Sequence, residues 1–161
     1  MCGIAGYVGD RESADVLVDA LSKLEYRGYD SAGIAVFDHG NIKVKKCKGR
    51  LANLVEKMDE EGKPQGHVGI GHTRWATHGE PSDINSHPHG NKRVTIVHNG
   101  IIENYKKLKD FLVGEGYSFA SETDTEVAAK LLDYYYDGDP MKTIAKVLSD
   151  TKGSYAHGIM F

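Results

Sequence analysis

Cys2 is the first side chain in this sequence that could do chemistry, because it lies directly behind the initiator methionine. Removal of Met1 would leave a thiol and a free α-amine on one residue. That amine titrates near pH 8, so part of it is neutral and can accept a proton. A thiol is a good nucleophile only as a thiolate, so Cys2 would bring its own general base. The alternative is a small apolar residue on an N-terminal strand behind a retained Met1.

Asn99 and Gly100 follow a strand that the pattern predicts for residues 93–98. A side-chain NH₂ next to a backbone N–H can stabilise an oxyanion, and glycine allows close approach to the reacting group. The competing interpretation is a plain hairpin turn, for which Asn-Gly is a strong signal. The sequence alone does not decide between an oxyanion hole and a hairpin turn.

Arg74 and Asp124 lie at the ends of two other predicted elements, a strand and a helix. An arginine fork binds a carboxylate with two parallel hydrogen bonds, and an aspartate can hold an ammonium group. Such a pair could therefore hold a free amino acid. Taken singly, Arg74 is equally explained by a surface ion pair and Asp124 by the dipole of the helix it begins.

Histidines are frequent, with eight in the chain. Five of them lie in one stretch: His72, His78, His87, His89 and His98. The stretch has no His-Glu-x-x-His motif and no paired Cys/His spacing, so it is weak evidence for a metal site. A metal-dependent hydrolase is kept as the least favoured alternative.

The bulk composition restricts the class of protein. A chain of 161 residues can bury one sizeable core. Its net charge of −3 does not favour nucleic acid or an anionic membrane as a partner. Neither a signal peptide nor an apolar stretch near the ~20 residues of a membrane span is visible. Cys2 and Cys47 are not in a Cys-x-x-Cys spacing, and we expect them to be reduced in the cytoplasm.

The elements that position these residues follow from the hydrophobic periodicity. We expect strands at 3–9, 34–37, 42–47, 68–74, 93–98 and 153–161, and helices at 11–24, 51–61, 105–115, 124–136 and 141–149. Residues 75–90 are predicted as a loop, and Thr123 with Glu126 as a capping box. This is an α+β pattern built on antiparallel sheet. The last strand is apolar, and an exposed apolar edge favours association, so a homo-oligomer is one possible state of the chain.

Several motifs, taken together, resemble the glutaminase domain of class II glutamine amidotransferases, which are N-terminal nucleophile hydrolases. They are residues 1–4, 27–33, 71–79, 98–104, 121–126 and 152–156. The residues of these motifs are most similar to the branch of the family that aminates fructose 6-phosphate, and less similar to the amidophosphoribosyltransferase branch. The resemblance implies a four-layer αββα sandwich, incomplete at its C-terminus. Residues 1–161 would be a truncated type 2 glutamine amidotransferase domain.

The resemblance also implies roles for the residues above. Cys2 would attack the side-chain amide of L-glutamine and form a glutamyl thioester, while Asn99 and Gly100 hold the oxyanion. Arg74 would bind the α-carboxylate and Asp124 the α-ammonium group. The other pocket residues carried over from the family are Arg27, Trp75, Thr77, His78 and His87. No metal and no organic cofactor is implied.

The family enzyme passes its ammonia to isomerase domains that bind fructose 6-phosphate, and these domains are absent from this sequence. We therefore expect the chain to release ammonia from glutamine without making the amino sugar. The alternative is a catalytically inactive fragment that binds glutamine or a partner. A retained Met1 would favour that alternative, because it blocks the amine of Cys2.

Overall fold

Two antiparallel sheets face each other in the computed structural model, which describes residues 2–77 and 79–161. The first sheet has the strand order β1 (Gly3–Val8), β4 (Val68–Arg74), β2 (Ser31–Asp38) and β3 (Asn41–Lys48). The second has the order β5 (His89–Gly90), β6 (Thr95–Ile102) and β7 (Gly153–Met160). Every paired strand in both sheets is antiparallel.

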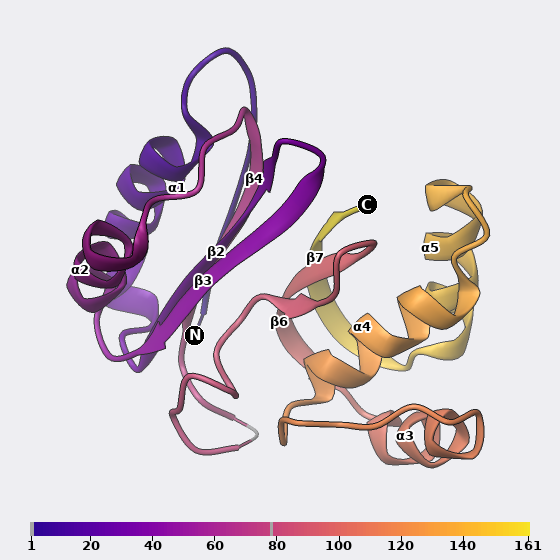
Figure 1. The fold of residues 1–161 in the computed structure, drawn as a ribbon. Helices are drawn as coiled ribbons and strands as arrows, with labels where there is room; N and C mark the ends of the chain where they lie inside the picture. The colour runs from indigo at the N-terminus through magenta and orange to yellow at the C-terminus, as the bar shows by residue number, and fades with distance from the viewer. Residues whose placement is uncertain (1, 78) are drawn as a thin grey trace.

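Helices cover the outer face of each sheet (Figure 1). On the first sheet lie α1 (Ser13–Ser22) and α2 (Leu51–Glu61), with the short 3₁₀ turn η1 (Glu25–Arg27) after α1. On the second lie α3 (Tyr105–Gly114), α4 (Asp124–Tyr135) and α5 (Pro140–Asp150). None of the helices in the described ranges has the length and apolar character needed to cross a membrane.

Three apolar clusters hold the layers together. Leu17 and Leu54 belong to the cluster under α1 and α2, and Ile96 and Leu131 to the cluster under the helices of the second sheet. A third, smaller cluster between the sheets contains Ala35, Ile42, Ile70, Val97 and Met160. The order helix, sheet, sheet, helix confirms the predicted αββα sandwich.

The structure corrects the sequence-based prediction at three places. Asn99 and Gly100 lie inside β6 and not at its end, because β6 continues to Ile102 in register with β7. The strand predicted at 34–37 begins earlier, at Ser31, because it pairs with both β3 and β4. The predicted loop at 75–90 ends in the short strand β5.

The start of α4 places Asp124 at the site, and its cap differs in one detail from the predicted capping box. The hydroxyl of Thr123 accepts the backbone N–H of Glu126 at 3.2 Å, as expected. The carboxylate of Glu126 instead accepts the backbone N–H groups of Ala120 and Ser121, at 3.0 and 2.6 Å. It therefore fixes the segment that leads into the helix.

Candidate active site

A cavity of about 610 Å³ collects the residues that the sequence analysis selected. The predicted residues on its wall are Cys2, Arg27, Arg74, Trp75, Thr77, His87, Asn99, Gly100 and Asp124. They come from the residue before β1, from η1, from the end of β4 and the loop after it, from β6 and from the start of α4. His78, which the family resemblance also placed here, lies outside the described residues, as does Met1.

Cys2 stands directly before β1, with its thiol against the backbone of Trp75. The Trp75 N–H donates to Sγ at 3.2 Å, and Sγ lies 3.4 Å from the Trp75 carbonyl oxygen. Burial raises the pKa of the Cys2 thiol, and the Trp75 N–H partly opposes this effect. The thiol is therefore mostly protonated at neutral pH and needs a base before it can act as a nucleophile.

Asn99 reaches from the second sheet to the backbone of Cys2. Its side-chain nitrogen Nδ2 donates to the Cys2 carbonyl oxygen at 3.0 Å. An amide NH₂ has two hydrogens, so one N–H can still be donated into the cavity. Next to it, Gly100 has a φ of 114° and contacts β7 so closely that a Cβ would lie 2.2 Å from the Ser154 carbonyl oxygen. Only glycine fits at this position.

Arg74 is the last residue of β4, and only 3% of it is exposed. Its guanidinium donates to the Gly79 carbonyl oxygen at 3.0 Å and lies 3.5 Å from that of Glu80, so it holds the loop that follows it. Burial lowers the pKa of Arg74, and the charge of Asp30 opposes this effect. The carboxylate of Asp30 also accepts the backbone N–H of Ala76. Arg74 therefore provides a fixed cation on the cavity wall.

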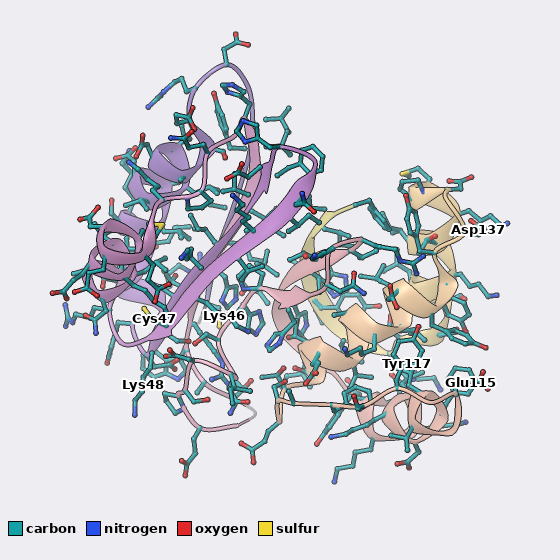
Figure 2. All side chains as sticks on the ribbon, in the orientation of Figure 1. Lys46, Cys47, Lys48, Glu115, Tyr117 and Asp137 are labelled. Atoms are coloured by element: carbon teal, nitrogen blue, oxygen red, sulfur yellow. The ribbon has the colours of Figure 1, made fainter. Side chains whose placement is uncertain are left out.

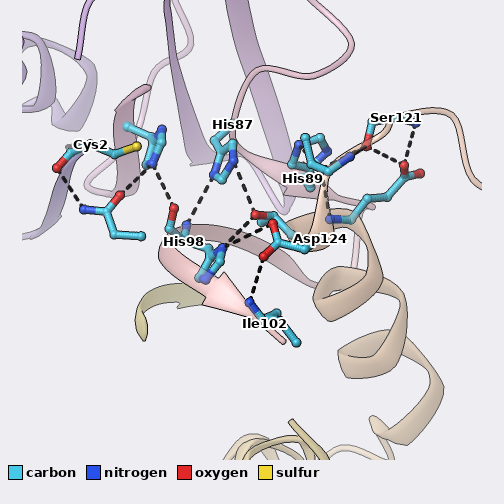
Figure 3. A network of polar contacts seen from close by, with 12 residues as sticks. Cys2, His87, His89, His98, Ile102, Ser121 and Asp124 are labelled. Atoms are coloured by element: carbon cyan, nitrogen blue, oxygen red, sulfur yellow. Dashed lines mark hydrogen bonds and ion pairs between the residues drawn. The ribbon is translucent and has the colours of Figure 1, made fainter. Parts of the chain in front are cut away.

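Asp124 provides the fixed anion. It is 4% exposed, and Oδ2 accepts the backbone N–H of Ile102 at 2.9 Å (Figure 3). Its other oxygen lies 3.9 Å from Nδ1 of His98. Because β6 ends at Ile102, this contact joins the end of the strand to the start of α4. A buried cation and a buried anion on one cavity wall suit a zwitterionic ligand.

His87 lies on the cavity wall, in the middle of a stack of histidine rings. Its ring is 4.0 Å from that of His72 and 6.4 Å from that of His98, nearly parallel to both. Its Nδ1 accepts the backbone N–H of His98 at 3.3 Å, and Nε2 faces the Thr125 hydroxyl at 3.3 Å (Figure 3). Burial lowers the pKa of His87 well below its usual value, so the ring is neutral and structural.

His89 and His98 also find hydrogen-bond partners within the protein. His89 meets the hydroxyl of Thr123 at 3.0 Å, and His98 that of Thr125 at 2.9 Å. Among the described residues, no three His, Cys, Asp or Glu side chains are arranged to hold a metal ion. These rings therefore stack and hydrogen-bond with one another and with the threonine hydroxyls, and His87 and His98 also form part of the cavity wall.

Lys46 and Cys47 point to opposite sides of β3 (Figure 2). The ammonium group of Lys46 donates to the carbonyl oxygens of Ser86 and Pro88, at 2.8 and 3.1 Å, and so fixes the segment that carries His87. Burial lowers the pKa of Lys46 to about 8. Cys47 faces the helices, is 7% exposed and lies in the cluster under α1 and α2. It is therefore a structural thiol.

Several wall residues were not predicted. They are His98, Ile101, Thr123, Thr125, Ser154, Tyr155 and Ala156. The β7 residues reach the cavity only because β7 pairs with β6, where Asn99 faces Ala156 and Gly100 faces Tyr155. The partner strand begins about 50 residues later, so local periodicity carries no signal for it. The motif at 152–156 was the one available hint.

The fold and the cavity together define a class. A four-layer αββα sandwich, with a cysteine before its first strand and an asparagine amide on that cysteine's carbonyl, is the arrangement of an N-terminal nucleophile hydrolase. A family described as "Glutamine amidotransferase domain" matches residues 72–161. The chain belongs to this family, and the prediction made from its motifs is confirmed.

Relatives and solved structures agree with this assignment. The glutamine--fructose-6-phosphate aminotransferase [isomerizing] of Clostridium tetani is 59% identical over 99% of this chain, and that of Thermus thermophilus is 52% identical over 97%. In both cases this chain spans only 26% of the length of the relative. The glutamine phosphoribosylpyrophosphate amidotransferase from B. subtilis, solved with ADP and GMP, superimposes with a TM-score of 0.85 at 29% identity. The superposition covers 99% of this chain and 35% of the B. subtilis chain.

Proposed function

We propose that this domain hydrolyses the side-chain amide of L-glutamine to glutamate and ammonia, with Cys2 as the nucleophile. The observation that carries the proposal is the bond from Asn99 Nδ2 to the Cys2 carbonyl oxygen, 3.0 Å long. It places an amide donor beside the residue that bears the thiol, on the wall of one cavity. A nucleophile next to an oxyanion donor is the minimum that acyl transfer requires.

The proposed reaction runs through a covalent intermediate. After removal of Met1, the neutral α-amine of Cys2 takes the thiol proton, and the thiolate attacks the amide carbon. The oxyanion is held by Asn99 Nδ2 and the N–H of Gly100. The C–N bond then breaks, and the leaving nitrogen takes the proton from the α-ammonium group and departs as ammonia. Water, deprotonated by the same amine, attacks the thioester and releases glutamate and the thiol.

Arg74 and Asp124 select the substrate in this proposal. The guanidinium binds the α-carboxylate of glutamine, and the carboxylate of Asp124 binds its α-ammonium group. Both are nearly fully buried, at 3% and 4% exposure, so each contact would be made where water screens it little. Arg27, Thr77 and His87 complete the wall. His78 is carried over from the family motif without structural description.

Trp75 gives the site a movable cover in this proposal. Its side chain is 50% exposed and stands edge-on to Tyr29, with ring centres 5.7 Å apart. Its backbone N–H donates to the thiol, so movement of the loop after Arg74 would change this contact with Cys2. We expect this loop to close on glutamine and Trp75 to lie on the exit path of ammonia.

Residues 1–161 would be the glutaminase domain of a longer enzyme. In that enzyme the ammonia would pass to isomerase domains and aminate fructose 6-phosphate, as the names of the relatives indicate for those proteins. We expect this to take place in the cytoplasm, because Cys2 and Cys47 are free thiols and a reactive thiol survives best in a reducing compartment.

Ammonia release from glutamine by the purified chain tests the proposal, after intact mass has shown that Met1 is removed. Cys2→Ala should abolish release. Cys47→Ala is the matched control and should keep it, because Cys47 lies in the helix-side core. Glutamine binding without ammonia release by the processed chain would overturn the proposal and favour a binding module.

The role of the α-amine has a separate test. The same chain with one alanine inserted between Met1 and Cys2 keeps the thiol but acylates its amine. It should bind glutamine and release no ammonia. Full activity in this variant would show that another group is the base. Loss of activity with a chelator and its return with zinc would favour the metal-dependent alternative.

A further inference from the structure

The amide of Asn99 can act as an oxyanion donor only in one of its two orientations. Rotation by 180° about the terminal bond exchanges Oδ1 and Nδ2 and would present an acceptor to the oxyanion. Something in the protein must therefore fix the orientation. The contacts behind Asn99 identify the group that does so.

The geometry points to His72 as a positioning residue for the oxyanion donor. Its Nε2 lies 2.9 Å from Asn99 Oδ1 and 2.9 Å from the carbonyl oxygen of His98. His72 is fully buried in β4 and is not on the cavity wall, so it acts on the ligand only through Asn99. This inference rests on the proposed function, because it names what orients the Asn99 amide for that reaction.

Two backbone carbonyl groups allow only one orientation of the Asn99 amide and one tautomer of His72. The His98 carbonyl oxygen is an acceptor that cannot flip, so His72 Nε2 must carry the hydrogen. The Cys2 carbonyl oxygen, 3.0 Å from the other end of the Asn99 amide, is also an acceptor. Flipping the amide would set Oδ1 against that oxygen and Nδ2 against the Nε2–H of His72. Both contacts would then be repulsive.

The surroundings keep His72 in this neutral form. His87 stacks on the ring at 4.0 Å and 11° between planes, which fixes the plane of the imidazole. Burial lowers the pKa of His72 to about 4, so the ring carries no charge near neutral pH. Among the described residues, Nδ1 of this ring has no hydrogen-bond partner, so no acceptor stabilises the other tautomer, with the hydrogen on Nδ1.

Ammonia release by His72 variants tests the inference. His72→Phe removes the donor and should lower kcat by roughly 5- to 30-fold, the change that one or two lost hydrogen bonds produce, with KM for glutamine unchanged. His72→Gln can place an amide N–H near the position of Nε2 and should recover most of the loss. Equal losses in the two variants would overturn the inference.

A double-mutant cycle distinguishes a positioning role from a general structural one. If His72 acts through Asn99, then His72→Phe should cause no further loss of kcat in an Asn99→Ala background. Losses that multiply would overturn the inference. The rate at which iodoacetamide alkylates Cys2 should be the same in His72→Phe as in the unaltered chain. A changed rate would mean that the variant had disturbed the thiol itself.

One readout does not depend on turnover. ¹⁵N NMR of the imidazole of His72 in the unaltered chain at pH 7 should show hydrogen on Nε2 and none on Nδ1. The opposite tautomer, or a charged ring, would overturn the inference even if the enzyme is active. Conversely, an inactive chain with the expected tautomer would refute the proposed function and leave the positioning of Asn99 intact.

Discussion

Lowering the pH from 7 to 5 should destabilise this fold through three buried histidines, His72, His87 and His89. Each is 6% exposed or less, and burial lowers the pKa of each ring below its usual 6.5. In the unfolded chain the same rings bind a proton below about pH 6.5. The stability that the neutral rings provide is therefore complete above pH 6.5 and is lost as the pH falls.

The magnitude follows from His72, whose pKa in the folded state is about 4. Each pH unit between the two pKa values costs about 1.4 kcal/mol per histidine, so the loss at pH 5 is about 2 kcal/mol. The pKa values of His87 and His89 are lowered in the same direction, so both rings add to this loss. The loss of about 2 kcal/mol from His72 alone is a sizeable share of the 5–15 kcal/mol that stabilises a typical domain.

Urea unfolding at pH 7 and pH 5 measures this effect. With m-values of about 2–3 kcal/mol/M, the loss from His72 alone should lower the midpoint by roughly 0.7 to 1 M, and His87 and His89 should lower it further. His72→Gln removes one titrating ring. Near pH 5.5 it should therefore reduce the slope of the free energy of unfolding against pH by the amount that corresponds to about one proton. Aspartates with lowered pKa values, such as Asp83 and Asp133, act only below about pH 4 and do not interfere. Equal midpoints at the two pH values would refute the reasoning.

Three substitutions test other parts of the account. Gly100→Ala should lose about 3 kcal/mol in urea unfolding, because its Cβ would lie 2.2 Å from a β7 carbonyl oxygen at a φ of 114°. Gly6→Ala, where nothing lies within 4 Å of the new Cβ, is the matched control and should change stability by less than about 0.5 kcal/mol. Asp124→Asn should raise KM for glutamine by about 10- to 100-fold with kcat nearly constant, because the ammonium group loses its charged partner; an unchanged KM would remove Asp124 from the binding site. Thr123→Ala should cost about 1 kcal/mol in thermal unfolding, because it deletes the cap bond to Glu126. A loss below 0.3 kcal/mol would show that the cap is not needed.

Local patterns predicted most of the elements because their signals lie within the elements themselves. The helix at 51–61 and the strand at 68–74 have the predicted bounds. The helix has helical apolar spacing and a stop at Gly62, and the strand runs directly into a polar loop. The hairpin of β2 and β3 turns at His39 and Gly40, where φ is 47° and 84°, as its turn residues predicted.

Tertiary pairing explains what the local patterns could not give. Asn99-Gly100 is a hairpin signal locally, yet the chain continues in β6 because β7 pairs with it along the whole length. The role of His72 also depends on other strands: it becomes visible only when β4 and β6 face each other and bring Nε2 to Asn99. In the sequence, His72 was one histidine among several near a polar loop.

The composition of the site was more predictable than its geometry. The motifs named nine residues that the structure places on one cavity wall. They gave no sign that Arg74 would hold its own loop through the Gly79 and Glu80 carbonyl oxygens, or that the Asn99 amide would be held between Cys2 and His72. Such contacts depend on where backbone carbonyls lie, and side-chain types do not encode this.

Acid quenching of the processed chain during turnover of glutamine, followed by peptide mass analysis, tests the central claim most directly. The account predicts one glutamyl group on the peptide that contains Cys2, none on the peptide that contains Cys47, and none on either after Cys2→Ala. Ammonia release that persists in Cys2→Ala, without a glutamyl group on Cys2 in the unaltered chain, would contradict it.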